Sequence, residues 1–336
     1  MTYRRIFISR LFCLLLLAQR FLVAQPVERV DAVGITVSDM DKALAFYTKV
    51  LPFEKISEQE FYGSEYERLK GLFGIRFRKA RLRLGDEEIE LTDYLTVGGR
   101  PIPVESRSND LWFQHIAIVV RDMDSAYARL RRFNVEHIST APQTLPPSIP
   151  AAAGIKAFYF RDMDGHALEL IYFPPDKGNP KWQRPTDKIF LGIDHTAIGI
   201  SSTQKSAAFY QQLLGMSKLG ESFNFGTEQE HLNNVFGASL RITGNGAASG
   251  FGVEFLEYLA PYGARPYPAD ARADDLIHWE TIFVVKNIEA LFKTLNASGV
   301  TLLSASVVTV PSRAFGYKKA FYARDPDGHV VGFFEK

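Results

Sequence analysis

The chain has 336 residues, which is enough for two ordinary domains or one large one. Hydrophobic residues make up 46% and charged residues 23%, the balance of a soluble globular protein. The formal net charge is only +1, and the sequence has no basic stripe that could hold a phosphate backbone. We therefore expect no nucleic-acid partner.

Residues 1–24 are typical of a secretory signal peptide. Arg4, Arg5 and Arg10 precede or border a short apolar run, 11–18, and the small residue Ala24 ends the segment. The run is too short to span a bilayer stably, so we expect no stable membrane insertion of the mature chain. The paired arginines also resemble a twin-arginine signal. We expect an exported, periplasmic or extracellular protein, with a retained membrane anchor as the alternative.

The only cysteine, Cys13, lies inside this segment. A mature chain would therefore have no disulfide, no thiolate nucleophile and no zinc site built on cysteine.

The rest of the chain is a duplication. His195 stands opposite Ala32 at an offset of 163 positions (195 − 32), and the same or nearly the same offset relates several further segments. The matching segments are 30–51 with 193–214, 89–95 with 253–259, and 161–166 with 324–329. We assign residues 28–175 to a first domain (modules one and two), 176–188 to a linker, and 189–336 to a second domain (modules three and four).

Each half divides again into two modules of the order β-α-β-β-β. In the first half, the opening β-rich runs end at Asp39 and Asp122, which can cap the helices that follow. The Asp-Gly pairs at 164–165 and 327–328 predict tight turns between the last two strands of modules two and four. The four modules are expected at about residues 32–97, 112–173, 190–261 and 277–335.

These modules resemble the vicinal-oxygen-chelate superfamily, which includes glyoxalase I, bleomycin-resistance proteins and extradiol dioxygenases. The segments that carry the resemblance are 31–39 with Phe46-Tyr47, 194–197 with Phe209-Tyr210, and 164–170. The resemblance covers essentially the whole mature chain. It implies an α+β fold in which four βαβββ modules pair into two incompletely closed eight-stranded barrels, each with a concave interior that could hold a ligand. It implies much less about the reaction, because the superfamily hosts many chemistries.

The resemblance also implies two metal-ligand positions in each module, one early in the first strand and one in the last strand. In chain order, the four modules offer Ala32 and Glu90, His115 and Glu169, His195 and Glu254, and Glu280 and Gly332. Alanine and glycine side chains cannot bind a metal. Only the two middle modules therefore keep both ligands.

The alternation of side chains along a strand supports the middle pairs. His195 shares a strand face with Ala197, a small residue that leaves room inside a barrel. Glu169 lies on an otherwise apolar face, where a carboxylate is costly unless it is paired or bound to a cation. We interpret His166 and His329, which follow the Asp-Gly turns, as turn-flanking residues and not as ligands.

The pairing of modules decides which site forms. If the middle modules pair, one barrel holds His115, Glu169, His195 and Glu254. Two imidazoles and two carboxylates suit a divalent ion of Fe, Mn, Ni, Co or Zn with two open positions. The rival pairing, one with two and three with four, gives two poorer sites with one histidine each. Modules one and four each lack one ligand, because Ala32 and Gly332 occupy the corresponding positions, and this pattern favours the middle pairing.

By resemblance, the two open positions would hold two adjacent oxygens of a small-molecule substrate, with Glu169 or Glu254 as the general base. That describes a lyase or isomerase, and with iron the same residues suit a dioxygenase. The alternative is a metal-free protein that binds a drug or metabolite. We expect a monomer or a weak homo-oligomer.

The polar segment 227–234 lies between two expected strands of module three. It could line the mouth of the pocket, with His231 and Asn234 as substrate-binding residues. A solvated short helix is the alternative interpretation.

Overall fold

The computed structural model describes residues 27–96, 98–311 and 314–336. The expected signal peptide and Cys13 lie outside these residues. Within the described ranges, no helix combines the length and the apolar character needed to cross a membrane.

The four expected modules are present and follow the predicted β-α-β-β-β order, with an additional short α-helix in modules one and three and an additional short strand in module three. Module one contains β1 (Arg29–Val37), α1 (Met40–Ala45), π-helix η1 (Phe46–Val50), β2 (Glu54–Tyr62), α2 (Ser64–Lys70), β3 (Arg76–Leu84) and β4 (Glu87–Tyr94). Module two contains β5 (Gln114–Val120), α3 (Met123–Arg132), β6 (Gln143–Thr144), β7 (Lys156–Arg161) and β8 (Ala167–Tyr172). A short 3₁₀ helix, η2 (Pro180–Gln183), lies in the linker between the halves.

The second half repeats this plan. Module three contains β9 (Phe190–Ile200), α4 (Thr203–Ala207), π-helix η3 (Ala208–Leu213), β10 (Ser217–Phe225), α5 (Thr227–Asn233), β11 (Ser239–Gly246), β12 (Ser249–Gly250) and β13 (Gly252–Ala260). Module four contains β14 (Trp279–Val284), α6 (Ile288–Ala297), β15 (Val308–Thr309), 3₁₀ helix η4 (Ala314–Gly316), β16 (Lys319–Arg324) and β17 (Val330–Glu335).

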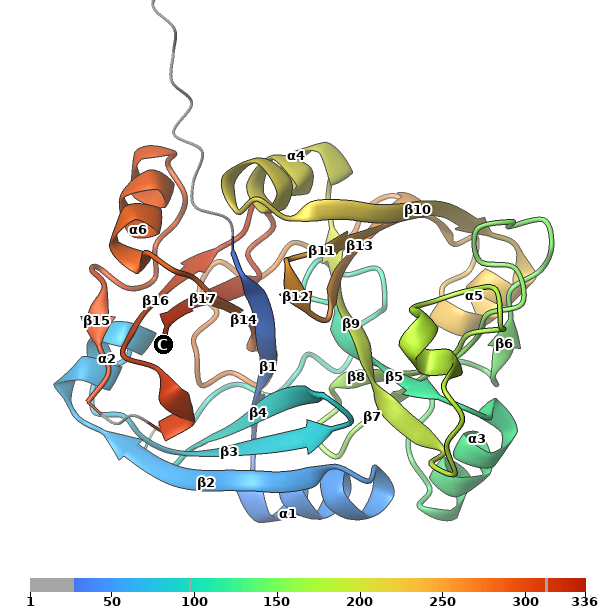
Figure 1. Ribbon diagram of the computed structural model, residues 1–336, viewed down its shortest axis with the longest axis horizontal. Coiled ribbons are helices and arrows are strands. Elements are labelled where there is room, and N and C mark those ends of the chain that lie inside the picture. The colour runs from blue at the N-terminus through green and yellow to red at the C-terminus, as the bar shows by residue number, and fades with distance from the viewer. Residues whose placement is uncertain (1–26, 97, 312–313) are drawn as a thin grey trace, which may run out of the picture.

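The strands form two curled mixed sheets, each following a path of eight strands. One sheet has the order β15-β16-β17-β14-β1-β4-β3-β2, with β12 added beside β1, and the other has the order β10-β11-β13-β9-β5-β8-β7-β6. The blue and red ends of the chain share one sheet, and the green and yellow middle forms the other (Figure 1). We call them the end barrel (modules one and four) and the middle barrel (modules two and three). The α+β fold with two incompletely closed barrels is confirmed.

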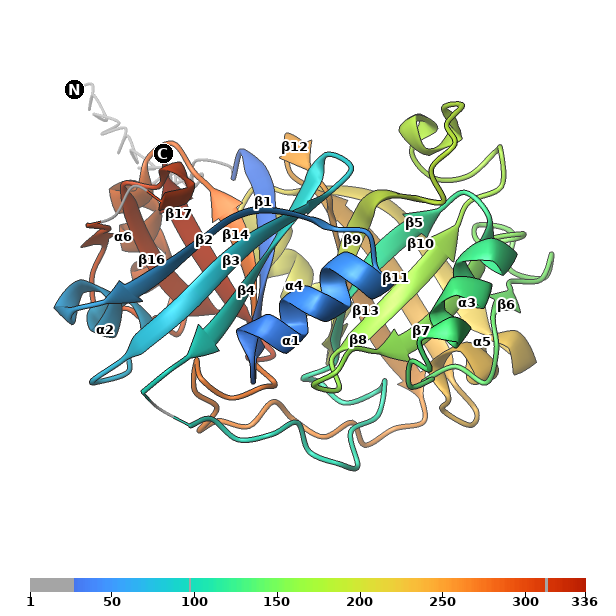
Figure 2. The same ribbon diagram turned by 90° about the horizontal axis from the view of Figure 1, so that it is seen from below.

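The pairing of the modules follows from their first strands. β5 lies antiparallel to β9 in the middle barrel, and β1 lies antiparallel to β14 in the end barrel. Of the two pairings left open by the sequence, the structure therefore has the middle modules together, and the pairing of module one with two and three with four does not occur. The two sheets stand side by side when the molecule is seen from below (Figure 2).

The two modules of one half still touch each other, although their strands lie in different sheets. The Tyr47 hydroxyl donates to Asp162 at 3.1 Å, and the Tyr210 hydroxyl makes the equivalent 3.1 Å bond to Asp325. Buried apolar side chains of all four modules form one large cluster that includes both tyrosines. The duplication thus produces two pseudo-equivalent contacts that fix the barrels to each other.

Local sequence signals explain the ends of the elements. Asp39 accepts hydrogen bonds from the backbone N–H groups of Asp41 and Lys42, and Asp122 accepts one from Ser125, so both residues are the helix caps that the sequence predicts. Gly165 has a φ of 93°, a value that glycine adopts without strain, in the turn before β8. Each cap therefore fixes the point at which the chain leaves the first strand of its module and begins a helix.

The end barrel contains a buried acid, Asp31, that should make stability depend on pH. Burial alone would raise its pKa, but the Tyr317 hydroxyl and the Arg81 guanidinium lower the pKa of Asp31 to about 2. A depressed carboxyl pKa stabilises the fold above the unfolded value near 4, and this stabilisation is lost as pH falls toward 2. We expect Asp31→Asn to cost about 2 kcal/mol of unfolding free energy at pH 7. In urea titrations from pH 7 to 2, the gap between variant and parent should shrink only below pH 4; a constant gap would contradict this assignment.

Candidate metal centre

The middle barrel brings the four expected ligand residues onto four adjacent strands. They are His115 on β5, Glu169 on β8, His195 on β9 and Glu254 on β13. Across the strands, two alanines lie between these four residues. Ala117 of β5 stands between His195 and Glu169, and Ala197 of β9 stands between Glu254 and His115. Because the alanines are small, the longer side chains can converge above them on one face of the sheet.

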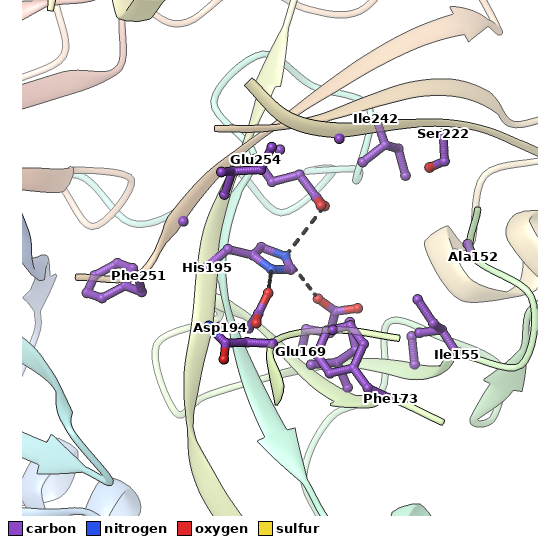
Figure 3. Close-up of a pocket in the computed structure, with 18 of the residues that line it drawn as sticks. Ala152, Ile155, Glu169, Phe173, Asp194, His195, Ser222, Ile242, Phe251 and Glu254 are labelled. Atoms are coloured by element: carbon purple, nitrogen blue, oxygen red, sulfur yellow. Dashed lines mark hydrogen bonds and ion pairs between the residues drawn. The ribbon is translucent and has the colours of Figure 1, made fainter. Parts of the chain in front are cut away.

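Three of the four residues meet closely. The ligand atoms of His115, Glu169 and His195 all lie within 4.8 Å of one another. His115 Nε2 is 3.1 Å and His195 Nε2 is 3.7 Å from Glu169 Oε2. Glu254 is outside this compact group but reaches it, because its Oε1 lies 3.4 Å from His195 Nε2 (Figure 3).

These separations fit a metal ion. Ligand atoms about 2.1 Å from one ion stand roughly 3–4.3 Å apart, depending on the angle between them. The measured 3.1, 3.4 and 3.7 Å all lie in that range. Nitrogen from two imidazoles and oxygen from carboxylates also form a donor set that first-row divalent ions accept. The residues present therefore fit the cation that the sequence implies.

The hydrogen bonds of His195 leave its inner nitrogen free for a ligand. Its Nδ1 lies 3.0 Å from Asp194 Oδ2, and an ionised carboxylate can only accept, so Nδ1 carries the hydrogen. Within the described part of the chain, His195 Nε2 is buried and makes no hydrogen bond. Nε2 is therefore the ring nitrogen that faces Glu169 and Glu254, and a metal ion would bind there in place of the Nε2 proton.

The electrostatic field at this point favours a cation. Burial alone would lower the pKa of His195, but the charges of Glu254 and Asp194 raise that pKa to about 10. Burial raises the pKa of Glu254 to about 7. Burial lowers the pKa of His115, which keeps its ring neutral near pH 7. The site therefore combines excess negative charge with one neutral imidazole, and a divalent ion would compensate both carboxylates.

Asp194 holds His195 in place and is itself held by the linker between the halves. The Trp182 indole in η2 donates to Asp194 Oδ1 at 2.7 Å. The preceding residue, Lys181, forms an ion pair with Glu87 of the end barrel, and Glu87 also accepts a hydrogen bond from the Ile193 backbone. The linker thus fixes the orientation of His195 through Asp194, a positioning role that the sequence reading did not assign.

We expect Asp194→Asn to weaken metal binding by about 10- to 100-fold, the usual effect of losing a partner that orients a metal-binding histidine. The amide cannot enforce the hydrogen on Nδ1, because its own N–H group can donate there instead. Competition with a metal chelator would measure the affinity, and Asp187→Asn, in the linker, is a control that should leave it unchanged. An unchanged affinity in Asp194→Asn would show that Asp194 does not orient the ligand.

A cavity of about 600 Å³ opens beside the site, with Glu169, His195 and Glu254 in its wall. Figure 3 shows these three side chains facing one another, with Ile155 and Phe173 on the apolar side of the cavity. The volume suits a small molecule, and the wall combines apolar side chains with several polar ones.

The segment 227–234 forms α5 and the residue that ends it. Gln229 and Leu232 of this helix line the cavity. His231 and Asn234 are exposed, and the cavity lining found among the described residues contains neither of them. Asn234 instead lines a separate cavity of about 200 Å³. The structure therefore brings the segment to the site through neighbours of the two residues that the sequence singled out.

Among the residues that the structure describes, the end barrel has no comparable set of ligands. Glu90 forms a 2.6 Å ion pair with Lys79, and Glu280 forms an ion pair with Lys70 and a 2.9 Å hydrogen bond with His278. Opposite Glu90 on the neighbouring strand stands Arg81, whereas Gly244 stands opposite Glu254 in the middle barrel. The interior of the end barrel therefore contains the side chains of Lys70, Lys79 and Arg81, whereas the middle barrel has a glycine, Gly244, at the position equivalent to Arg81. His166 and His329 are also not at the site, and their Nε2 atoms contact backbone carbonyls at 2.8 Å.

Comparison with known proteins agrees with this architecture. The family model for the "Glyoxalase/Bleomycin resistance protein/Dioxygenase superfamily" matches residues 29–170 and 192–333. Glyoxalase I from Zea mays is 17% identical, covers 93% of this chain and 92% of its own, and has a TM-score of 0.59. A putative dioxygenase from Bacillus subtilis is 15% identical, covers 93% and 86%, and has a TM-score of 0.55. No curated protein sequence matches the chain. At these identities, the structural likeness establishes the fold alone.

Proposed function

The chain belongs to the glyoxalase/bleomycin resistance protein/dioxygenase superfamily, and we propose that it is a divalent-metal-dependent enzyme acting on a small molecule with two adjacent oxygens. The observation that carries the proposal is the convergence of His115, Glu169 and His195, with all ligand atoms within 4.8 Å, beside a cavity whose wall includes Glu169 and His195. We propose proton transfer next to a carbonyl, as in a lyase or isomerase, as the reaction.

The residues divide the work as follows. His115, Glu169 and His195 would hold the ion, which supplies Lewis-acid polarisation of two adjacent substrate oxygens. Glu254 is the proposed base, because it stands outside the compact three-residue group and a quarter of its side chain is exposed. Its pKa, raised by burial to about 7, matches a group that accepts and returns a proton near neutral pH. Glu169 is almost fully buried and is better suited to hold the ion than to move a proton.

A dioxygenase is the second candidate, and one observation favours it. The compact group contains two histidines and one carboxylate, the donor set that non-haem Fe²⁺ oxygenases use with open positions for dioxygen and substrate. The presence of Glu254 beside that group favours proton transfer, because a dioxygenase has no evident use for a second carboxylate there.

We also propose that the protein is exported. The support is the sequence of residues 1–24 alone, where arginines precede a short apolar run and a small residue. Cell fractionation with N-terminal sequencing would test it: protein outside the cytoplasm that starts near Gln25 supports export, and protein in the cytoplasm with an intact Met1 contradicts it.

The reaction can be tested with the metal-loaded full chain and dihydroxyacetone in D₂O. We expect metal-dependent deuterium exchange at the carbon next to the carbonyl, followed by NMR. Glu254→Gln should lower the exchange rate by about 100-fold or more, the usual contribution of a positioned base, with metal content unchanged. Full exchange in Glu254→Gln would exclude Glu254 as the base. Oxygen uptake with catechol and no exchange would favour the dioxygenase, and a chain without bound metal would favour a metal-free binding protein.

A further inference from the structure

Three buried amide side chains form a connected group at the cavity wall, away from the metal ligands. Asn224 lies on β10, and Gln229 and Asn233 lie on α5. Asn224 Nδ2 donates to Gln229 Oε1 at 2.9 Å, and Gln229 Nε2 donates to Asn233 Oδ1. We call these residues the amide triad. Each is at most 3% exposed, and Asn224 and Gln229 line the cavity.

The amide triad has an unused acceptor. Asn224 Oδ1 is buried and has no hydrogen-bond partner among the residues that the structure describes. In this structure Asn224 Nδ2 donates to Gln229, which leaves Oδ1 as the open atom of the Asn224 amide. Leaving a buried acceptor unpaired costs about 1–3 kcal/mol, so a partner that arrives with a ligand would recover that loss.

The duplication supplies an internal control for these positions. In the end barrel, Phe61 of β2 stands in the place of Asn224: Phe61 pairs with Phe77 of β3 as Asn224 pairs with Leu240 of β11. Tyr66 is the third residue of α2, as Gln229 is the third residue of α5. Phe61 and Tyr66 pack edge to face in an apolar cluster at 5.2 Å between ring centroids.

The last residue of each short helix differs in charge. Lys70 ends α2, and Asn233 ends α5. Lys70 Nζ donates to Tyr322 at 3.0 Å and to Glu280, so it fills the interior of the end barrel with a cation. The same fold thus accepts aromatic rings and a lysine at these three positions. The module fold itself therefore does not require amides at these positions, which points to a role toward a ligand.

The charged residues of the cavity wall indicate which chemical class of ligand the cavity can accept. Among its described lining residues, the only lysine or arginine is Lys181, and that ammonium is already paired with Glu87. Glu221 is paired with Lys218 at 3.0 Å. Away from the metal ligands, a carboxylate or phosphate would find no unpaired lysine or arginine among the described lining residues, and burying an unpaired charge is costly.

From these observations we propose that the amide triad is a substrate subsite that binds an uncharged hydrogen-bond donor, such as a hydroxyl or amide N–H group, through Asn224 Oδ1. The substrate class is then a neutral molecule with two adjacent oxygens at one end and such a donor at the other. This inference rests on the proposed metal-binding function and specifies its substrate. It excludes a substrate whose remote end carries a carboxylate or phosphate.

Calorimetric titration of the metal-loaded full chain with three catechols, without oxygen, tests the proposal. The probes are catechol itself and catechols with a hydroxymethyl or a carboxylate group at carbon 4. We expect the hydroxymethyl probe to bind about 3- to 10-fold more tightly than catechol, the effect of one neutral hydrogen bond, and the carboxylate probe to bind more weakly than catechol. Asn224→Leu should abolish the preference for the hydroxymethyl probe over catechol.

Ser222→Ala is the matched control, because Ser222 lies two residues earlier on the same strand face and also lines the cavity but is outside the amide triad. It should keep the preference, and Asn224→Ala serves as the second variant if Asn224→Leu does not fold. A preference retained without Asn224, an equal loss for all three probes, or tightest binding of the carboxylate would overturn the inference. Metal content is measured separately, so loss of metal counts against the proposed function and selective loss of the hydroxymethyl preference tests the subsite.

Discussion

Replacing Lys79 by methionine should lower the free energy of unfolding by about 3–5 kcal/mol, the usual loss when one partner of a buried ion pair is removed. Lys79 Nζ lies 2.6 Å from Glu90 Oε2, and the two side chains are 8% and 1% exposed. Arg81 approaches Glu90 only to 3.7 Å and already binds Asp31 and Glu88, so it cannot replace the lysine. Urea unfolding followed by fluorescence would measure the loss.

Two controls separate this cause from a simple change of side chain. The double variant Lys79→Met with Glu90→Gln should recover most of the loss, because it leaves no unpaired charge. Lys218→Met removes an exposed partner of Glu221 at 3.0 Å and should cost no more than about 1 kcal/mol. A small loss in Lys79→Met, similar to that in Lys218→Met, would show that the end barrel does not depend on its internal cations.

His195→Ala should weaken binding of a divalent ion by at least about 100-fold, since loss of a partner that only orients a ligand already costs 10- to 100-fold. His195 Nε2 faces both Glu169 and Glu254, so its removal leaves two carboxylates without the imidazole between them. Chelator competition gives the affinity. The control is His231→Ala, because that histidine is exposed on α5 and outside the cavity lining. Equal affinity in the two variants would place the metal elsewhere.

The sequence predicted the architecture well because the duplication allows each module to be compared with the others. The offset that aligns Ala32 with His195 also reveals which modules keep their ligands, and that loss favoured the pairing that the structure has. The caps Asp39 and Asp122 were predictable because capping depends on residues two or three positions apart. Local and repeated signals were thus sufficient for the fold and for the ligand strands.

Contacts between segments that are distant in the chain could not be predicted from the sequence. Trp182 lies in a linker whose composition predicts only a boundary, yet its indole holds Asp194. Lys70 and Asn233 occupy matching helix ends, but nothing local shows that the lysine reaches Glu280 inside a barrel. His231 and Asn234 were the candidates in their segment, although the helix turns Gln229 toward the cavity and leaves both of them exposed. Such features depend on how elements pack, which the repeat offset does not encode.

The metal stoichiometry of the purified full chain tests the central claim most directly. After incubation with a divalent ion such as Mn²⁺ or Fe²⁺ and removal of the excess, we expect one equivalent per chain by elemental analysis. That result follows because His115, Glu169 and His195 form one site in the middle barrel while cations occupy the end barrel. Two equivalents would contradict the asymmetry between the barrels. No bound metal would contradict the proposed enzyme and leave a metal-free binding protein.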